Sequence, residues 1–211
     1  MINTVKLPTR KGKVYLKVAH GHFATNHSHI NYYVDVTDQK TRLSDARAAA
    51  LELSTHYSTN TIIDTIFCLD GTGLIGAFLA HELTKSGFLS INSHHSIYVV
   101  EPENNNNNQL MFRDNLKHAI AGKHVLILAA SVSTGYTIKR SVEAIRYYGG
   151  NPVGVCSIYS MLDEACGFPV QSIFDLRDLP DYESYDSLNC PLCKKGQKLD
   201  ALVNSYGYSA L

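Results

Sequence analysis

The chain has 211 residues with 19 basic and 19 acidic side chains, so its formal net charge is zero. This length suits one ordinary domain with at most small attachments. A balanced charge gives no field that would gather nucleic acid or an anionic membrane surface, so the expected partner is a small molecule. No apolar stretch approaches the roughly 20 residues of a membrane span, and residues 1–6 lack the core of a secretory signal. We therefore expect a cytoplasmic protein without nucleic-acid or membrane partners.

Apolar periodicity predicts strands and helices that alternate along most of the chain. In chain order we expect strand 30–36, helix 44–57, strand 61–69, helix 73–85, strand 96–100, strand 125–130, helix 138–148 and strand 153–159. Continuous apolar strands alternating with helices indicate an α/β fold with a mostly parallel central sheet covered by helices on both faces. In such sheets ligands bind beyond the carboxyl ends of the strands.

The turn after the predicted strand 61–69 is rich in glycine. Its sequence is Leu69-Asp70-Gly71-Thr72-Gly73-Leu74-Ile75-Gly76-Ala77. Glycines let a backbone approach a ligand closely, a Thr hydroxyl can donate to it, and an Asp carboxylate can hold a magnesium-bound water. A tight glycine turn without a ligand is the alternative for this segment, since doubly wound sheets often contain one.

The regular pattern is interrupted between residues 101 and 122, which include five consecutive asparagines at 104–108. This polar stretch predicts a mobile surface loop or hairpin between two core strands. After residue 160 the chain becomes turn-rich. We therefore expect one principal domain over residues 1–185 and a C-terminal extension over residues 186–211.

The turn after the predicted strand 125–130 carries several hydroxyl side chains and opens a helix. Its candidate ligand-binding residues are Ser131, Ser133, Thr134, Gly135, Tyr136 and Thr137. Such a turn directs several backbone N–H groups at one spot, with the positive end of the helix dipole behind them, which suits a phosphate. The alternative is an ordinary strand-to-helix connection with a Ser/Thr cap, but a cap needs only one hydroxyl.

The five cysteines are an odd number scattered through the chain and do not indicate a disulfide framework. Cys190 and Cys193 have the Cys-x-x-Cys spacing of half a zinc site. The two further ligands would have to come from elsewhere, and the histidines available at alternate positions are His20, His22, His27 and His29. A redox pair, or a turn with two structural cysteines, remains an alternative to zinc.

Two segments resemble a known family. The order strand, Ser/Thr-rich turn, Thr134-Gly135, helix resembles the phosphoribosyl-diphosphate signature of type I phosphoribosyltransferases. Residues 21–35, with Gly21-x-Phe23, a polar turn and an aromatic strand, resemble the N-terminal hood of orotate phosphoribosyltransferases. The resemblance spans roughly residues 20–160 in consistent order. It implies the type I phosphoribosyltransferase fold, with a hood over about residues 1–40, a mobile loop over about residues 101–122 and a small Cys-containing C-terminal extension.

The resemblance also implies a function, namely transfer of a phosphoribosyl group from phosphoribosyl diphosphate to a nucleobase with release of diphosphate and use of Mg²⁺. The hydroxyl-rich turn at 131–137 would hold the 5′-phosphate of this compound or of a nucleoside monophosphate. Asp70, Gly71, Thr72 and Gly73 would hold diphosphate and magnesium, Asp70 and Arg113 would act in catalysis, and Phe23, Asn26 and His27 would lie near the base. A homodimer is implied as well.

Three departures from the family pattern favour an alternative function. Ala129-Ala130 stands where the family carries two acidic residues that hydrogen-bond the ribose hydroxyls, and Asn26 stands where it usually has a lysine. The loop that is normally rich in lysine and arginine has only Arg113, Lys117 and His118 as cations. The alternative is a regulatory protein that kept the phosphate-binding turn and lost the reaction.

Overall fold

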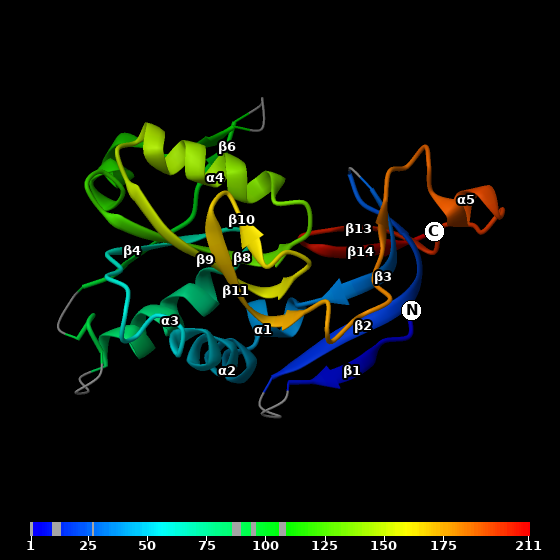
Figure 1. The fold of residues 1–211 in the computed structure, drawn as a ribbon, viewed down its shortest axis with the longest axis horizontal. Helices are drawn as coiled ribbons and strands as arrows, with labels where there is room; N and C mark the ends of the chain where they lie inside the picture. Colours follow the sequence, from blue (N-terminus) through cyan, green and yellow to red (C-terminus); the bar gives the residue numbers. More distant parts are fainter. Residues whose placement is uncertain (1, 10–13, 27, 86–89, 94–95, 106–108) are drawn as a thin grey trace. The chain divides into compact units, whose positions relative to one another are not determined.

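The computed structural model describes residues 2–9, 14–26, 28–85, 90–93, 96–105 and 109–211 (Figure 1). Two compact units make up the chain. We call Gln39–Asp175 the central unit, and Met1–Asp38 together with Leu176–Leu211 the N/C unit. No helix in the described part of the chain is both long and apolar enough to cross a membrane.

The central unit is built on a mostly parallel sheet with the strand order β10-β11-β9-β8-β4-β5. The strands are β4 (Thr65–Cys68), β5 (Tyr98–Val100), β8 (His124–Val132), β9 (Asn151–Ser160), β10 (Glu164–Ala165) and β11 (Phe168–Asp175). Only the β10–β11 pair is antiparallel among the pairs of this sheet. When the parallel strands are numbered along the chain, their order across the sheet is 2-1-3-4-5, and this order reverses between β4 and β8.

Helices cover both faces of this sheet. Helices α2 (Leu43–Ser54) and α3 (Gly73–Thr84) lie on one face, and α4 (Tyr136–Tyr147) lies on the other (Figure 1). On the α4 side, the apolar core includes Phe67, Ile127, Ile138, Val142 and Ile145. The predicted α/β fold, with a mostly parallel sheet between two helical layers, is confirmed.

Strand β8 is the central strand and extends further than its sequence predicts. Val125, Leu126, Ile127 and Leu128 are fully buried, because β4 and β9 pair on either side and helices cover both faces. The strand continues beyond residue 130, since Ser131 and Val132 pair with residues of β9. Ser131 thus belongs to the strand end, and the turn proper begins after it.

Strand β4, in contrast, is shorter than the predicted strand 61–69. Side chains take part in the hydrogen bonds at its start: the Ile63 N–H donates to Asn92 Oδ1 at 2.9 Å, and the His124 N–H donates to Asp64 Oδ2 at 2.8 Å. Regular pairing with β5 and β8 begins only at Thr65. Apolar periodicity cannot foresee this, because the competing hydrogen bonds come from residues distant in the sequence.

The segment 101–122 is partly folded. Strands β6 (Glu103–Asn104) and β7 (Leu110–Met111) form the predicted hairpin, and the 3₁₀ helix η1 (Asp114–Ala119) follows. Phe112 is 3% exposed and makes an edge contact with Phe67 at a centroid distance of 5.4 Å. The second half of the segment is therefore anchored in the core rather than a surface loop. Of the asparagine run, residues 106–108 lie outside the described residues.

The N/C unit joins the two ends of the sequence in one sheet of order β12-β3-β2-β13-β14, with β1 also paired to β2. Its elements are β1 (Val5–Pro8), β2 (Tyr15–Ala24), β3 (His29–Asp35), β12 (Ser184–Tyr185), α5 (Pro191–Lys194), β13 (Ala201–Asn204) and β14 (Gly207–Ala210), and α1 (Thr37–Thr41) lies at the sequence junction with the central unit. Ala201 pairs with Phe23 in parallel register. The C-terminal extension is thus part of the sheet that contains the N-terminal strands.

Candidate functional site

The two ligand-binding turns predicted from the sequence follow adjacent strands of the same sheet. Strands β4 and β8 are parallel neighbours, with Cys68 opposite Leu128, and the Leu69 N–H donates to the Leu128 carbonyl at 2.8 Å. Both strands end at the same edge of the sheet, at the point where the strand order reverses. This edge is where open α/β sheets bind their ligands.

The turn after β8 presents the start of helix α4. Gly135 is the N-cap of this helix, has a φ of +75°, and has no side chain with which to cap it. The Tyr136 N–H lies 3.5 Å from Thr134 Oγ1, longer than an ordinary hydrogen bond. The side chains of Ser131, Ser133, Thr134, Tyr136 and Thr137 are exposed. The helix thus begins without a Ser/Thr N-cap, and exposed hydroxyl side chains lie in the turn before it and in its first turn.

The turn after β4 differs, because its hydroxyl points inward. Thr72, the N-cap of α3, is fully buried, and its Oγ1 donates to the Leu69 carbonyl at 2.8 Å and lies 3.2 Å from the Leu128 carbonyl. Asp70 and Gly71 have φ values of +56° and +75°, so two consecutive residues adopt the left-handed conformation. What this turn presents at the sheet edge is therefore backbone and the Asp70 carboxylate.

Asp70 links the two strand ends. Its carboxylate accepts a hydrogen bond from the Ala130 N–H, and the Lys40 ammonium donates to the Asp70 carbonyl at 3.0 Å. Burial raises the pKa of the Asp70 carboxyl, and the Lys40 charge and the Ala130 N–H oppose that rise. Ala129 and Ala130 are themselves 1% and 4% exposed. The Asp70 carboxylate therefore contacts the backbone of the strand end that carries Ala129 and Ala130.

Glu101 is a further candidate site residue, one that the sequence pattern did not indicate. Its Oε1 accepts a hydrogen bond from the Gly73 N–H at 3.1 Å, so a carboxylate occupies the start of α3. Glu101 follows β5, which pairs with β4, and this neighbourhood is the signal that could have identified it. Asp70 and Glu101 together provide oxygen donors, the ligands that Mg²⁺ prefers.

Arg113 is held in an exposed ion pair. Its Nη2 lies 2.7 Å, and its Nε 3.0 Å, from Glu103 Oε2. The hydrogen bonds from Arg113 lower the pKa of the Glu103 carboxyl. Because the pair is open to water, its partners separate readily, and the guanidinium is available to a competing anion.

The predicted base-binding residues belong to the N/C unit. Phe23 is 1% exposed and packs against Tyr33 with a centroid distance of 6.0 Å, so its ring forms part of the core of that unit. Asn26 is exposed in the turn between β2 and β3. His27 lies outside the described residues.

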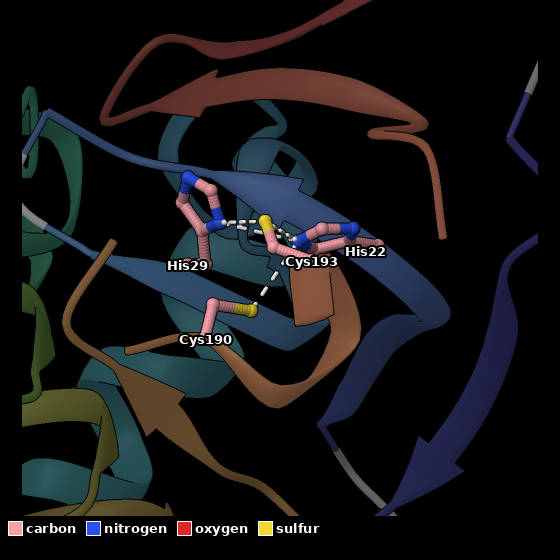
Figure 2. A group of neighbouring side chains, drawn as sticks. All are labelled: His22, His29, Cys190 and Cys193. Atoms are coloured by element: carbon pink, nitrogen blue, oxygen red, sulfur yellow. Dashed lines mark hydrogen bonds between the residues drawn. The ribbon is translucent and has the colours of Figure 1, made fainter. Parts of the chain in front are cut away.

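The N/C unit also contains a cluster of potential metal ligands. His22, His29, Cys190 and Cys193 each offer a ligand atom, and these four atoms all lie within 4.8 Å of one another (Figure 2). Of the other candidate histidines, His20 makes an edge contact with Tyr32 instead. The sequence spacing predicted the two cysteines, whereas the choice between the histidines required the fold.

Comparisons with known proteins agree with this architecture. No protein-family model matches the chain. A curated orotate phosphoribosyltransferase from Caldanaerobacter subterraneus is 35% identical over 77 residues, which span 36% of this chain and 38% of that relative. The structure of Leishmania donovani UMP synthase matches with a TM-score of 0.55 and 19% identity, covering 77% of this chain and 34% of that one. Mycobacterium tuberculosis orotate phosphoribosyltransferase, in complex with 5-phospho-α-D-ribosyl 1-diphosphate, matches with a TM-score of 0.50 and 17% identity, covering 70% and 82%.

The structural matches have low sequence identity and show the fold, while the sequence match covers little more than a third of either chain. Both point to the same group of proteins. The chain therefore has the fold of the type I phosphoribosyltransferases, and over 77 residues its sequence is similar to orotate phosphoribosyltransferases.

Proposed function

We propose that this chain binds 5-phospho-α-D-ribosyl 1-diphosphate, or a nucleoside monophosphate, and transfers the phosphoribosyl group to a nucleobase with release of diphosphate. The observation that carries the proposal is the position of two ligand-binding turns beyond adjacent parallel strands, where the strand order reverses. The solved relative in complex with this same diphosphate has the same fold and supports it.

The start of α4 would bind the 5′-phosphate. A phosphate there accepts hydrogen bonds from backbone N–H groups and is attracted by the helix dipole. The exposed hydroxyls of Ser133, Thr134 and Thr137 would add further donors. Gly135 supports this role, because its left-handed conformation directs the chain into the helix without a side chain over the phosphate.

The turn at 70–73 would bind the diphosphate. Glu101 holds the Gly73 N–H in the structure, and an incoming diphosphate would compete for this donor. The displaced Glu101 carboxylate and Asp70 would then hold Mg²⁺, whose charge stabilises the diphosphate as it leaves. Residues 39–175 thus contain donors for both ends of the substrate.

In the proposed reaction a ring nitrogen of the base attacks the anomeric carbon of the ribose. The carbon–oxygen bond to diphosphate breaks, and its electron pair leaves with the diphosphate. The protein positions the two partners and stabilises the charge of the leaving group. Arg113 would exchange Glu103 for phosphate, because its planar fork suits bidentate contact with an anion.

The ribose hydroxyls lack the usual acidic pair as partners. Each lost charge-assisted hydrogen bond forfeits roughly 1.5–3 kcal/mol. We propose that Asp70 partly compensates, because its carboxylate already accepts the Ala130 N–H at that strand end.

A second candidate is a nucleotide-binding regulatory protein without turnover. The observation that favours it is the burial of Ala129 and Ala130, which present only methyl groups where the family has carboxylates. Such a protein would keep the phosphate site at the start of α4 and bind nucleoside monophosphates as signals.

One experiment separates the two candidates. The protein is incubated with phosphoribosyl diphosphate, Mg²⁺ and a panel of pyrimidine and purine bases, and diphosphate release is measured. Release with one base establishes the transferase and identifies the nucleobase. Nucleotide binding by calorimetry without any release establishes the regulator, and no binding of phosphate compounds contradicts both. Light scattering of the same preparation tests the homodimer that the family resemblance implies.

A further inference from the structure

We propose that His22, His29, Cys190 and Cys193 form a structural zinc site within the N/C unit. The four residues come from three separate segments: β2 carries His22, β3 carries His29, and the two cysteines flank the start of α5. Figure 2 shows their side chains turned toward a common centre. The site involves no residue of the phosphate-binding turns, so it stands independently of the proposed transferase activity.

The distances between the ligand atoms fit a tetrahedral ion. His22 Nε2 lies 3.2 Å from His29 Nδ1, 3.5 Å from Cys190 Sγ and 3.6 Å from Cys193 Sγ, and His29 Nδ1 lies 3.3 Å from Cys193 Sγ. With ordinary zinc bond lengths, a regular tetrahedron has edges of about 3.3 Å between two nitrogens and about 3.6 Å between nitrogen and sulfur. These four of the six separations are close to the tetrahedral edges, and all six are within 4.8 Å.

A hydrogen bond to the far side of the His22 ring prepares it for a metal. His22 Nδ1 lies 2.9 Å from the Gln197 carbonyl, to which this nitrogen must donate its proton. In a neutral ring the lone pair is then on Nε2, the atom that faces the other three ligands. Such a carbonyl partner behind a ligating histidine fixes the tautomer and orientation of the ring, as in known metal sites.

Hydrogen bonds among the four side chains do not by themselves explain why their ligand atoms lie so close together. Cys190 Sγ, Cys193 Sγ and His29 Nδ1 all approach His22 Nε2, which has a single lone pair. His22 and Cys190 are fully buried, so water does not reach these two side chains, whereas His29 and Cys193 lie at the accessible edge of the cluster. A cation at the centre gives all four atoms a partner at once, and the two thiolates neutralise its charge.

The backbone holds the ligands in place. The Lys194 N–H donates to the Cys190 carbonyl, and the Gly196 N–H donates to the Cys193 carbonyl, which closes a tight turn around the cysteines. Asp200 fixes the opposite strand, since its carboxylate accepts the His22 N–H at 2.7 Å. The ligands are therefore presented by rigid local structure on both sides.

Zinc is the ion that this ligand set favours. Two thiolates and two imidazoles suit a borderline ion with tetrahedral geometry, whereas Mg²⁺ and Ca²⁺ require oxygen ligands. Four protein ligands leave no open position, which is typical of a structural rather than a catalytic zinc. The ion would tie the β2–β3 hairpin to a segment 171 residues away in the sequence, closing a long loop.

Metal analysis of the full chain tests the proposal. Protein purified without chelator should contain about one equivalent of zinc. After replacement by Co²⁺, it should show the intense visible bands of a tetrahedral ion and the charge-transfer band of cobalt–thiolate bonds. Cys193→Ser and His29→Ala should lower zinc retention against a competing chelator at least about tenfold. Both side chains lie at the accessible edge of the cluster, so these variants disturb the core least.

Matched controls on the same chain are Cys166→Ser and His20→Ala. Cys166 is an exposed free cysteine outside the cluster, and His20 is on β2 but contacts Tyr32. Both controls should retain the full equivalent of zinc. Less than a tenth of an equivalent in wild-type protein grown and refolded with zinc would overturn the proposal. So would an octahedral cobalt spectrum, a Cys190–Cys193 disulfide in freshly reduced protein, or equal zinc loss in the control variants.

Discussion

Substitution of Thr137 by aspartate should stabilise the protein and weaken its binding of phosphate. Thr137 is the second residue of α4, and its side chain is exposed. A carboxylate in the first turn of a helix gains about 0.3–1 kcal/mol from the dipole. The same carboxylate about 5 Å from a phosphate dianion is repelled by about 1.7 kcal/mol even at the dielectric constant of bulk water. This penalty corresponds to a roughly 18-fold loss of affinity at low ionic strength.

The matched control is Thr137→Asn, which has the same shape and no charge. Urea unfolding gives the stability of both variants, and calorimetry with inorganic phosphate or a nucleoside monophosphate gives their affinity. At physiological salt, screening over a Debye length of about 8 Å should reduce the difference in affinity to roughly fivefold. Equal phosphate affinities of the two variants at low salt would refute the assignment of the 5′-phosphate to the start of α4.

Three further predictions concern neighbouring groups. Gly135→Ala should lose about 1–2 kcal/mol of stability and also most phosphate binding. Gly167→Ala, where φ is a similar +83°, should lose only stability. Equal phosphate affinities of the two variants in calorimetry would contradict this prediction. Burial raises the pKa of the Asp70 carboxyl above its unfolded value. The protonated carboxyl therefore favours the folded state at low pH, and this contribution to the free energy of unfolding is lost as pH rises through the raised pKa. Asp70→Asn should therefore unfold at higher urea than wild type at neutral pH but not at pH 4, and should lose Mg²⁺-dependent diphosphate binding. Glu103→Gln should release Arg113 and tighten phosphoribosyl diphosphate binding at low salt; unchanged affinity would show that Arg113 does not reach the ligand.

Much of the central unit could be predicted from the sequence, because its strands are continuous apolar runs. Residues 125–128 are apolar without interruption, and this pattern is typical of a strand buried on both faces. The strand ends were harder to predict. Regular pairing of β4 begins only after the point where the side chains of Asn92 and Asp64 accept backbone hydrogen bonds, and neither contact leaves a periodic signal.

The candidate sites also contain residues that the sequence could predict and residues that only the fold brings together. Gly135 and its neighbours could be predicted as a candidate phosphate-binding turn because they are contiguous in sequence. Glu101 could not, since its role depends on β5 pairing with β4. The choice of His22 and His29 as partners of the cysteines likewise depends on a hairpin and a C-terminal turn that only the fold brings together.

The parallel pairing of β13 with β2 determines when the N/C unit can fold during synthesis. His22 leaves the ribosome long before its partner Asp200, which follows 178 residues later. The central unit lies wholly between these two segments and needs neither of them for its own sheet. Translation should therefore deliver a folded central unit first, while the N-terminal hairpin waits with an unpaired strand edge for chaperones or for the last strands to emerge.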